Sequence, residues 1–270
     1  MKQIAIVTGA SSGMGKEFVR QIDGGYFGKL DEIWVIARTK EKLQALKDQC
    51  YTPIRVFAAD IATPNELNEF LIALQSEEPM VKILVNSAGW GKFADVAESS
   101  ISELHNMVDV NSQGLLEITY QVLPYLVRGS KIINLSSTAA FMPIAGSAVY
   151  AASKAFVLSF SRSLHYELKD VGISVTAVCP AGVKTDFFTH AGNESGVKNI
   201  IDVFGISDAH NIVRRALEDA ELGKDLSIPT LSAWAMYISS KLLPYQAMMN
   251  FQEYLKSFSS DGAHEYEGQI

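Results

Sequence analysis

The chain has 270 residues, of which 48 % are hydrophobic, and its 23 Lys and Arg against 30 Asp and Glu give a formal net charge of −7. This length and composition suffice for one large α/β domain with a sizeable core. The acidic balance and the lack of a long basic run argue against a nucleic-acid partner. Two cysteines and five histidines without ligand spacing predict no metal site. No apolar run reaches the ~18 residues that span a bilayer, so we expect a cytoplasmic protein without a spanning segment.

Short β-branched runs alternate with longer stretches of helical periodicity along the chain. The predicted strands are Ile4–Val7, Ile33–Ile36, Ile54–Ala58, Ile83–Val85, Ile132–Leu135, Ser174–Val178 and Leu226–Ile228. The predicted helices are Gly15–Gln21, Lys40–Gln49, Pro64–Ser76, Ile101–Val127 with a bend, Tyr150–Val171 and Ser207–Leu222. Thr63 is the expected N-cap of the third helix, and Gly172 and Gly223 are the expected C-terminal glycines of the last two.

This alternation predicts an α/β fold in which right-handed crossovers build a doubly wound parallel sheet of about seven strands, with helices on both faces. The strands read as near-continuous apolar runs, as strands covered on both faces do. No linker or low-complexity tract interrupts the pattern. We therefore expect a single domain, with the α/β part in residues 1–229 and a helical C-terminal extension in residues 230–270.

A glycine-rich turn follows the first predicted strand, in the stretch IAIVTGASSGMG. A P-loop does not fit, because Ala10 stands where its first glycine belongs and Glu17 follows Lys16 in place of a hydroxyl residue. Glycines at a helix start instead let the backbone approach a pyrophosphate, which the helix N-terminus attracts. The stretch predicts the dinucleotide-binding turn of a Rossmann-type fold, although its G-x-x-x-G-x-G spacing departs from the general fingerprint. A plain strand-to-helix turn is the alternative.

Five motifs, in order along the chain, resemble those of the short-chain dehydrogenase/reductase family. They are TGASSGMG, NSAG at 86–89, an asparagine at 111, NLSS ending at Ser137, and Tyr150-x-x-x-Lys154. The resemblance is to the single-domain branch and covers about residues 3–229. It implies a Rossmann-type dinucleotide-binding and catalytic domain that works as a short-chain NAD(P)-dependent alcohol dehydrogenase or ketone reductase.

The resemblance also implies a catalytic tetrad of Asn111, Ser137, Tyr150 and Lys154. Tyr150 would exchange a proton with the substrate oxygen, and because a free phenol has a pKa of ~10, we expect the Lys154 ammonium one turn away to lower it. Lys154 would also bind the nicotinamide ribose. Ser137 would hold the substrate oxygen where charge develops, with Ser136 as the competing candidate. Asn111 would bend its helix and hold a water near the lysine, or would interrupt the helix without a catalytic part.

The cofactor site that the family implies draws on the ends of several strands. Its members would be Gly9, Ser11, Ser12, Gly13, Met14, Gly15, Arg38, Asp60, Ile61, Asn86, Ala88, Gly89, Tyr150, Lys154, Pro180, Val183 and Thr185. Ala37 stands where an acid would bind the ribose hydroxyls of NAD, and Arg38 follows, so NADP(H) is favoured over NAD(H). The alternative is that Arg38 stacks on adenine and NAD binds. Ala181 replaces a usual glycine, which is a departure from the family pattern.

Apolar side chains follow the catalytic motifs and fill the extension. They include Trp90, Phe93, Phe141, Met142, Phe187, Phe188, Val203, Phe204, Trp234, Met236, Tyr237, Met248 and Met249. They favour a largely apolar alcohol or ketone. An alicyclic compound such as a hydroxysteroid is the leading hypothesis, and a 3-oxoacyl chain is the alternative. The extension could equally form a subunit seam or an interfacial membrane helix.

Two further expectations concern the kind of protein and its assembly. A non-catalytic nucleotide-sensing protein of the same fold is disfavoured, because such relatives typically lack the tyrosine or the lysine, and both are present. Family members usually associate through the helices that follow Asn111 and Tyr150, so we expect a homodimer or homotetramer.

Overall fold

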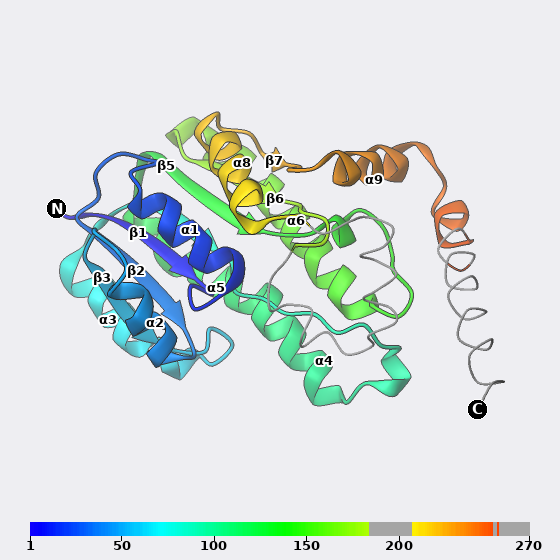
Figure 1. Ribbon diagram of the computed structural model, residues 1–270, viewed down its shortest axis with the longest axis horizontal. Coiled ribbons are helices and arrows are strands. Elements are labelled where there is room, and N and C mark those ends of the chain that lie inside the picture. Colours follow the sequence, from blue (N-terminus) through cyan, green and yellow to red (C-terminus); the bar gives the residue numbers. More distant parts are fainter. Residues whose placement is uncertain (184–206, 251–252, 254–270) are drawn as a thin grey trace, which may run out of the picture.

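A parallel sheet lies between two layers of helices in the computed structural model, which describes residues 1–183, 207–250 and 253 (Figure 1). Its strands are β1 Gln3–Thr8, β2 Glu32–Ala37, β3 Ile54–Ala58, β4 Met80–Asn86, β5 Leu126–Leu135, β6 Ser174–Val178 and β7 Leu226–Ser227. The strand order is β3-β2-β1-β4-β5-β6-β7, and each neighbouring pair is parallel. All seven predicted strands are present, and the Rossmann-type prediction is confirmed.

The described residues form the following helices, most of which cover one or the other face of the sheet. They are α1 Gly13–Asp23, α2 Lys40–Lys47, α3 Asn68–Glu77, α4 Ile101–Val108, α5 Leu115–Val122, α6 Ala148–Leu168, α8 Ala209–Glu221 and α9 Leu231–Leu242. Buried residues of α1, α2 and α8 form one core with the sheet, and those of α3, α5 and α6 form the other. Each prediction of a helix between two strands is therefore confirmed.

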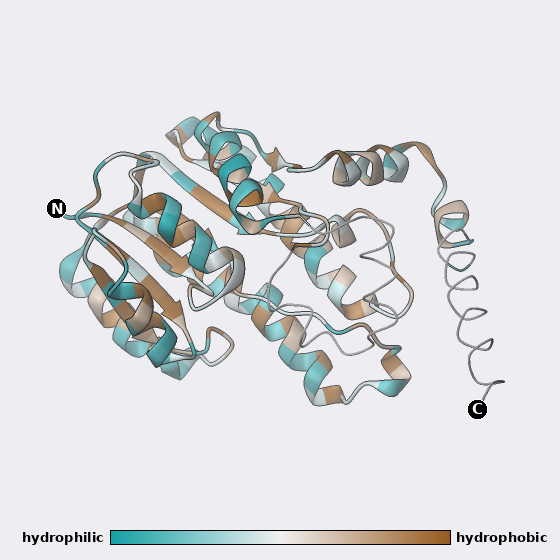
Figure 2. Ribbon diagram, in the orientation of Figure 1, coloured by the Kyte–Doolittle hydropathy of each residue, from teal (hydrophilic) through white to brown (hydrophobic). Residues whose placement is uncertain are grey.

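Alternate strand residues serve the two cores. In β1, Ala5 and Val7 pack in the core of α1, α2 and α8, whereas Ile4 and Ile6 pack in the opposite one, and all four are fully buried. Figure 2 shows the strands as largely hydrophobic and the helices as mixed, as expected for a sheet covered on both faces. Core residues thus cover both faces of the sheet. We therefore expect a ligand site at the carboxyl ends of the strands, where ligands bind in open α/β sheets.

The segment predicted as one bent helix over Ile101–Val127 is built differently. It comprises α4, a π-helical segment Asp109–Gly114, α5 and a short 3₁₀ turn Leu123–Tyr125. The α-helix is thus interrupted by a π-helical segment, a feature that often marks functional positions. The end of the prediction is wrong, because Leu126 already begins β5, where it pairs with Val81 of β4. Pairing with a neighbouring strand, which periodicity does not reveal, decides this boundary.

Helix ends follow the predictions in part. Gly172 and Gly223 have positive φ values of 80° and 67° after their helices, as a C-terminal glycine requires. Thr63 precedes a 3₁₀ turn, Pro64–Leu67, that leads into α3, and its side chain makes no capping hydrogen bond. The predicted helical extension begins with α9, whose Ala233 is fully buried beside Phe141. Within the described residues, every helix is too short or too polar to cross a membrane.

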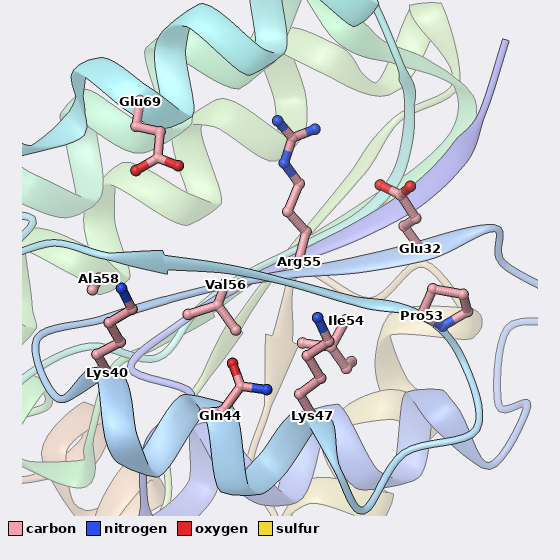
Figure 3. A pocket seen from close by; sticks show the side chains of 10 residues that line it. All are labelled: Glu32, Lys40, Gln44, Lys47, Pro53, Ile54, Arg55, Val56, Ala58 and Glu69. Carbon is pink, nitrogen blue, oxygen red and sulfur yellow. The ribbon is translucent and has the colours of Figure 1, made fainter.

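A shallow cavity of about 540 Å³ lies along β3, the edge strand beside α2 (Figure 3). Its lining includes the charged side chains of Lys40, Lys47, Arg55, Glu32 and Glu69, and none of its ten residues belongs to the predicted catalytic or cofactor site. Charged side chains on an edge strand discourage pairing with another chain. These charges therefore protect the edge of the sheet, and the predicted site residues lie elsewhere, at the carboxyl ends of the strands.

Candidate active site

Two turns meet where the strand order reverses, between β1 and β4. Thr8 ends β1, and its Oγ1 accepts hydrogen bonds from the backbone N–H groups of Ser87 and Ala88 at 3.1 and 3.2 Å. Gly9 has a φ of +67°, and a Cβ there would come within 2.7 Å of the backbone of Ala88. A side chain at Gly15 would overlap the carbonyl group of Gly9. These glycines are therefore required by close backbone approach, as the dinucleotide-turn prediction expects.

The N-terminus of α1 opens onto this turn. Its N-cap residue, Ser12, makes no side-chain capping bond within the part of the chain that the structure describes. The first turn of the helix has the sequence Gly-Met-Gly-Lys, which carries a cation and no carboxylate. Ser11, Ser12, Gly13 and Met14 are all half-buried, so their backbone groups lie near the surface. Free helix N–H groups and a favourable dipole suit an anion, so these residues fit the pyrophosphate of a dinucleotide.

The ends of β2 and β3 bring Arg38 and Asp60 together. Arg38 follows β2 with a side chain that is 74 % exposed, and its Nη1 lies 4.0 Å from Asp60 Oδ2. The sequence predicted Asp60 as a cofactor-site residue, but it did not reveal that this carboxylate lies beside Arg38, because the two residues follow different strands. An exposed pair at this distance contributes little free energy, so the guanidinium can exchange Asp60 for another anion. Ile61 is buried, and its carbonyl oxygen would lie 2.8 Å from any Cβ at Gly114.

The four residues of the predicted tetrad come from three elements and meet at the carboxyl ends of β4 and β5. Lys154 Nζ lies 5.9 Å from the centre of the Tyr150 ring on α6. The Ser137 hydroxyl, which directly precedes the 3₁₀ turn Thr138–Ala140, is hydrogen-bonded to Tyr150. A Cβ at Gly89 would lie 3.0 Å from Asn111 Oδ1 and 3.2 Å from Lys154 Nζ, so these two groups flank the turn after β4.

Asn111 lies in the π-helical segment and is only 1 % exposed. Its Oδ1 accepts from the backbone N–H of Trp90 at 2.9 Å, and its Nδ2 donates to the Trp90 carbonyl at 2.8 Å and to Ser153 Oγ at 3.0 Å. The Asn111 amide is thus held by the turn after β4 on one side and by α6 on the other. An asparagine that merely interrupted a helix would not need this set of partners.

The two candidate serines have different surroundings. Ser136 is 3 % exposed, and its hydroxyl donates to the backbone carbonyl of Lys154 at 2.8 Å. Ser137 is half-buried and lies against the Tyr150 hydroxyl. The geometry therefore favours Ser137 as the residue that meets a substrate oxygen, and assigns Ser136 to the support of Lys154.

The expectation that Lys154 lowers the pKa of Tyr150 is wrong for this structure. Burial raises the pKa of Tyr150 to about 12, and the hydrogen bond from Ser137 offsets only part of that rise. Burial likewise lowers the pKa of Lys154 to about 8. Lys154 Nζ donates to the Leu135 carbonyl at 2.9 Å. Desolvation, which a sequence does not display, outweighs the charge effect.

The remaining predicted cofactor residues differ in how they are placed. Asn86 is buried, and its Nδ2 donates to Thr119 and Asn134 at 3.0 and 2.9 Å, which ties β4 to α5 and β5. The Pro180 carbonyl accepts from Thr138 N–H at 3.0 Å, so the turn after β6 contacts the loop 136–138 that follows β5. Val183 forms a parallel bridge with Ser207. Thr185 lies outside the described residues, as do Phe187, Phe188, Val203 and Phe204.

Apolar side chains surround the tetrad. The Phe93 ring lies 6.2 Å from that of Tyr150, and Met107, Ala139 and Ala151 form a buried cluster with Tyr150. Trp90, Ile144 and Val149 pack against the same cluster. In a separate cluster, the ring centre of Phe141 lies 5.1 Å from that of Tyr237 of α9. The catalytic tyrosine candidate therefore lies in an apolar setting.

The sequence did not reveal two participants, namely the backbone of Trp90 and the hydroxyl of Ser153, and it offered Ser136 only as a competitor of Ser137. Each directly contacts a residue that it did identify. A pattern of residue types cannot show which way a buried hydroxyl or a peptide group turns, because that depends on packing between elements distant in the sequence. The only available signal was that both serines adjoin predicted catalytic residues.

Comparison with known proteins agrees with this geometry. The family model for short chain dehydrogenase matches residues 3–195. An uncharacterised oxidoreductase of Staphylococcus epidermidis is 31 % identical over 210 residues, which cover 77 % of this chain and 89 % of the relative. An NADP-dependent 3-hydroxy acid dehydrogenase of Escherichia coli O6:H1 is 35 % identical over 181 residues, which cover 66 % of this chain and 71 % of the relative.

A solved structure extends the agreement to the fold. A short-chain dehydrogenase from Sphingobium yanoikuyae in complex with NADPH superposes with a TM-score of 0.75 at 26 % identity, covering 88 % of this chain and 93 % of the other. The family model spans most of the chain, the fold is shared, and the five motifs lie at one end of the sheet. On this evidence the chain belongs to the short-chain dehydrogenase family of oxidoreductases.

Proposed function

We propose that the chain is an NADP(H)-dependent oxidoreductase that interconverts a secondary alcohol and a ketone by hydride transfer. The observation that carries this proposal is the convergence of Asn111, Ser137, Tyr150 and Lys154 beside the Gly9 turn. A nucleotide-sensing protein would need the turn but not the tetrad. We also propose a single domain, in which residues 1–229 bind the cofactor and carry the chemistry and residues 230–270 extend it.

The residues present would hold a nicotinamide dinucleotide in a defined order. The N-terminus of α1 and its glycines would bind the pyrophosphate, Lys154 would bind the nicotinamide ribose, and Val183 with Thr185 would bind the carboxamide. When bound, this cofactor supplies or accepts the hydride. All other steps concern protons and orientation, which the chain's own side chains provide.

Proton transfer falls to Tyr150. With a pKa raised to about 12, its phenol stays protonated near neutral pH, which suits donation to a ketone oxygen during reduction. The Tyr150 O–H bond breaks as the new alcohol O–H bond forms. Ser137 would donate a hydrogen bond to the same oxygen while negative charge develops there. Lys154, charged below its pKa of about 8, stabilises the phenolate that remains.

The preference for NADP(H) rests on Arg38. Its exposed guanidinium follows β2, the place from which an arginine can accommodate a 2′-phosphate in folds of this kind, and Ala37 offers no carboxylate to the ribose. The Escherichia coli relative is NADP-dependent by name, and the Sphingobium structure contains NADPH. Asp60 argues against this preference, because its carboxylate beside Arg38 would repel the 2′-phosphate.

The substrate we propose is a largely apolar alicyclic ketone or alcohol such as a hydroxysteroid. The apolar cluster around Tyr150 and the contact of Phe141 with Tyr237 support this class. A second candidate is a short hydroxy acid, because the Escherichia coli relative is a 3-hydroxy acid dehydrogenase. A 3-oxoacyl chain, which combines a polar head with an apolar tail, is the remaining alternative.

A panel of compounds tests both the reaction and the substrate. NADPH absorbance would be followed with bulky alicyclic ketones, 3-oxoacyl thioesters and short oxo acids, and the reverse reaction with the matching alcohols. Turnover of bulky apolar ketones supports the leading proposal. Turnover confined to short acids would overturn the substrate class while keeping the reaction, and NADPH binding with no turnover on any compound would favour the nucleotide-sensing alternative.

A homodimer or homotetramer is also proposed. Exposed apolar side chains on α5 and α6 include Leu116, Tyr120 and Phe156, at 41 %, 67 % and 40 % exposure. Such a face is what subunit association would cover. Sedimentation that shows a monomer at micromolar concentration would exclude this assembly.

A further inference from the structure

A serine that neither family resemblance nor charge points to lies between the two catalytic residues of α6. Ser153 is 4 % exposed. Its Oγ donates to the Tyr150 carbonyl at 2.7 Å and accepts from Asn111 Nδ2 at 3.0 Å. A buried serine inside a helix gains no helix propensity from its hydroxyl, so the hydroxyl's value lies in the contact with Asn111.

The direction of these bonds fixes the orientation of the Asn111 amide. The single hydroxyl proton of Ser153 is given to the Tyr150 carbonyl, so its oxygen can only accept from Asn111. The Trp90 backbone requires the same orientation, because its N–H donates to Asn111 Oδ1 at 2.9 Å and its carbonyl accepts from Nδ2 at 2.8 Å, and Ser153 is the further partner of the NH₂ group. A flipped amide would place two acceptors against each other. This orientation keeps Asn111 Oδ1 beside Gly89, where Lys154 Nζ also lies.

We propose that Ser153 is a positioning residue for the hydride-transfer reaction, because its hydroxyl fixes the Asn111 side chain and joins the π-helical segment 109–114 to the catalytic turn of α6. The inference rests on the proposed function for its catalytic part. Its structural part, the hold on Asn111, is independent of any activity.

The same helix contains a matched control. Ser161, two turns further on, is fully buried, donates to the Val157 carbonyl at 2.6 Å and accepts from Asn134 Nδ2 at 2.9 Å. The two serines thus share burial and bonding pattern, but Asn134 is outside the tetrad. Ser161→Ala should lower stability as much as Ser153→Ala does. A difference between the two variants in any other measurement then isolates the contact with Asn111.

The first experiment does not depend on catalysis. The side-chain NH₂ signals of Asn111 would be assigned in ¹⁵N-edited NMR spectra by their loss in Asn111→Asp. In Ser153→Ala these signals should move and exchange faster with water, whereas in Ser161→Ala they should stay in place. Unchanged Asn111 signals in Ser153→Ala would overturn the proposal, whether or not the protein proves to be a reductase.

The second experiment measures coupling on whichever substrate the panel identifies. Ser153→Ala should lower kcat by about tenfold, the kinetic equivalent of one hydrogen bond, with the Kd of NADPH unchanged. Combined with Asn111→Ala, it should lower kcat no further than Asn111→Ala alone. Ser153→Thr, which keeps the hydroxyl, should recover most of the activity. Additive losses, or an equal loss in Ser161→Ala, would show a merely structural role.

Discussion

The turn after β1 and the predicted tetrad of Asn111, Ser137, Tyr150 and Lys154 are built in different ways. The turn is built from backbone, where Gly9 and Gly15 permit a close approach that any side chain would block. The tetrad is built from side chains, of which Asn111, Tyr150 and Lys154 are buried, and burial shifts the pKa values of Tyr150 and Lys154. A glycine that the backbone requires can therefore be recognised in the sequence. The pKa shifts of a buried site cannot, because they depend on how the chain packs.

The largest effect should come from removing the proton donor of the tetrad while leaving the turn intact. Tyr150→Phe deletes one hydroxyl and should lower kcat by about 10³-fold or more, since general-acid catalysis typically contributes 10²–10⁴. The Kd of NADPH, measured by fluorescence titration, should change little because the turn is untouched. Substantial residual turnover in this variant would remove Tyr150 from the mechanism.

Replacing the buried ammonium should separate activity from stability. Lys154→Met should lower kcat by about 10²-fold, and should raise the free energy of unfolding by up to about 3 kcal/mol, the equivalent of a pKa lowered from 10.5 to about 8. This destabilisation in the wild type is present below pH ~8 and fades as the pH rises, because the folded lysine deprotonates first. The stability gap between wild type and variant should therefore narrow above that pH, and wild-type kcat should fall over the same range.

Lys131 provides the control for that experiment, since burial also lowers its pKa. It lies on β5 and its backbone pairs with Ile83. Lys131→Met should leave kcat and its pH dependence unchanged. Equal losses of activity in the two variants would indicate that charge removal acts through the fold and not through the tetrad.

The same contrast between backbone and side chain explains how far the sequence could be interpreted. The seven strands, the glycine turn and the tetrad residues follow from apolar runs and motifs. The boundary at Leu126 and the Asp60 partner of Arg38 do not, because both depend on a neighbouring strand. The high pKa of Tyr150 also does not follow from the sequence, because it is caused by burial, which arises only when the chain folds.

The backbone half of the comparison can be tested at two glycines with positive φ. Gly9→Ala should raise the Kd of NADPH by about tenfold or more and destabilise the fold by about 2 kcal/mol, because left-handed backbone costs ~1–2 kcal/mol and the new Cβ would meet Ala88 at 2.7 Å. Gly25 is the control, because its φ is +89° and a Cβ there would have no heavy atom within 4 Å. Gly25→Ala should lower the free energy of unfolding through backbone strain alone, and the Kd of NADPH should stay unchanged in titration. A normal Kd in Gly9→Ala would mean that the turn does not approach a dinucleotide.

The smallest expected effect concerns the choice of cofactor, where side-chain charge acts at an exposed position. Arg38→Asp should lower the ratio of kcat/KM for NADPH over that for NADH by about tenfold or more, since it removes a bidentate phosphate partner and adds a repelling charge. Lys42→Asp makes the same charge change on exposed α2 and should leave the ratio nearly unchanged. Asp60→Asn should raise the ratio slightly, because it frees the guanidinium that now lies 4.0 Å from Asp60. If the ratio stays constant in Arg38→Asp, the arginine contacts adenine rather than a phosphate, and the preference for NADP(H) is wrong even though the turn and the tetrad stand.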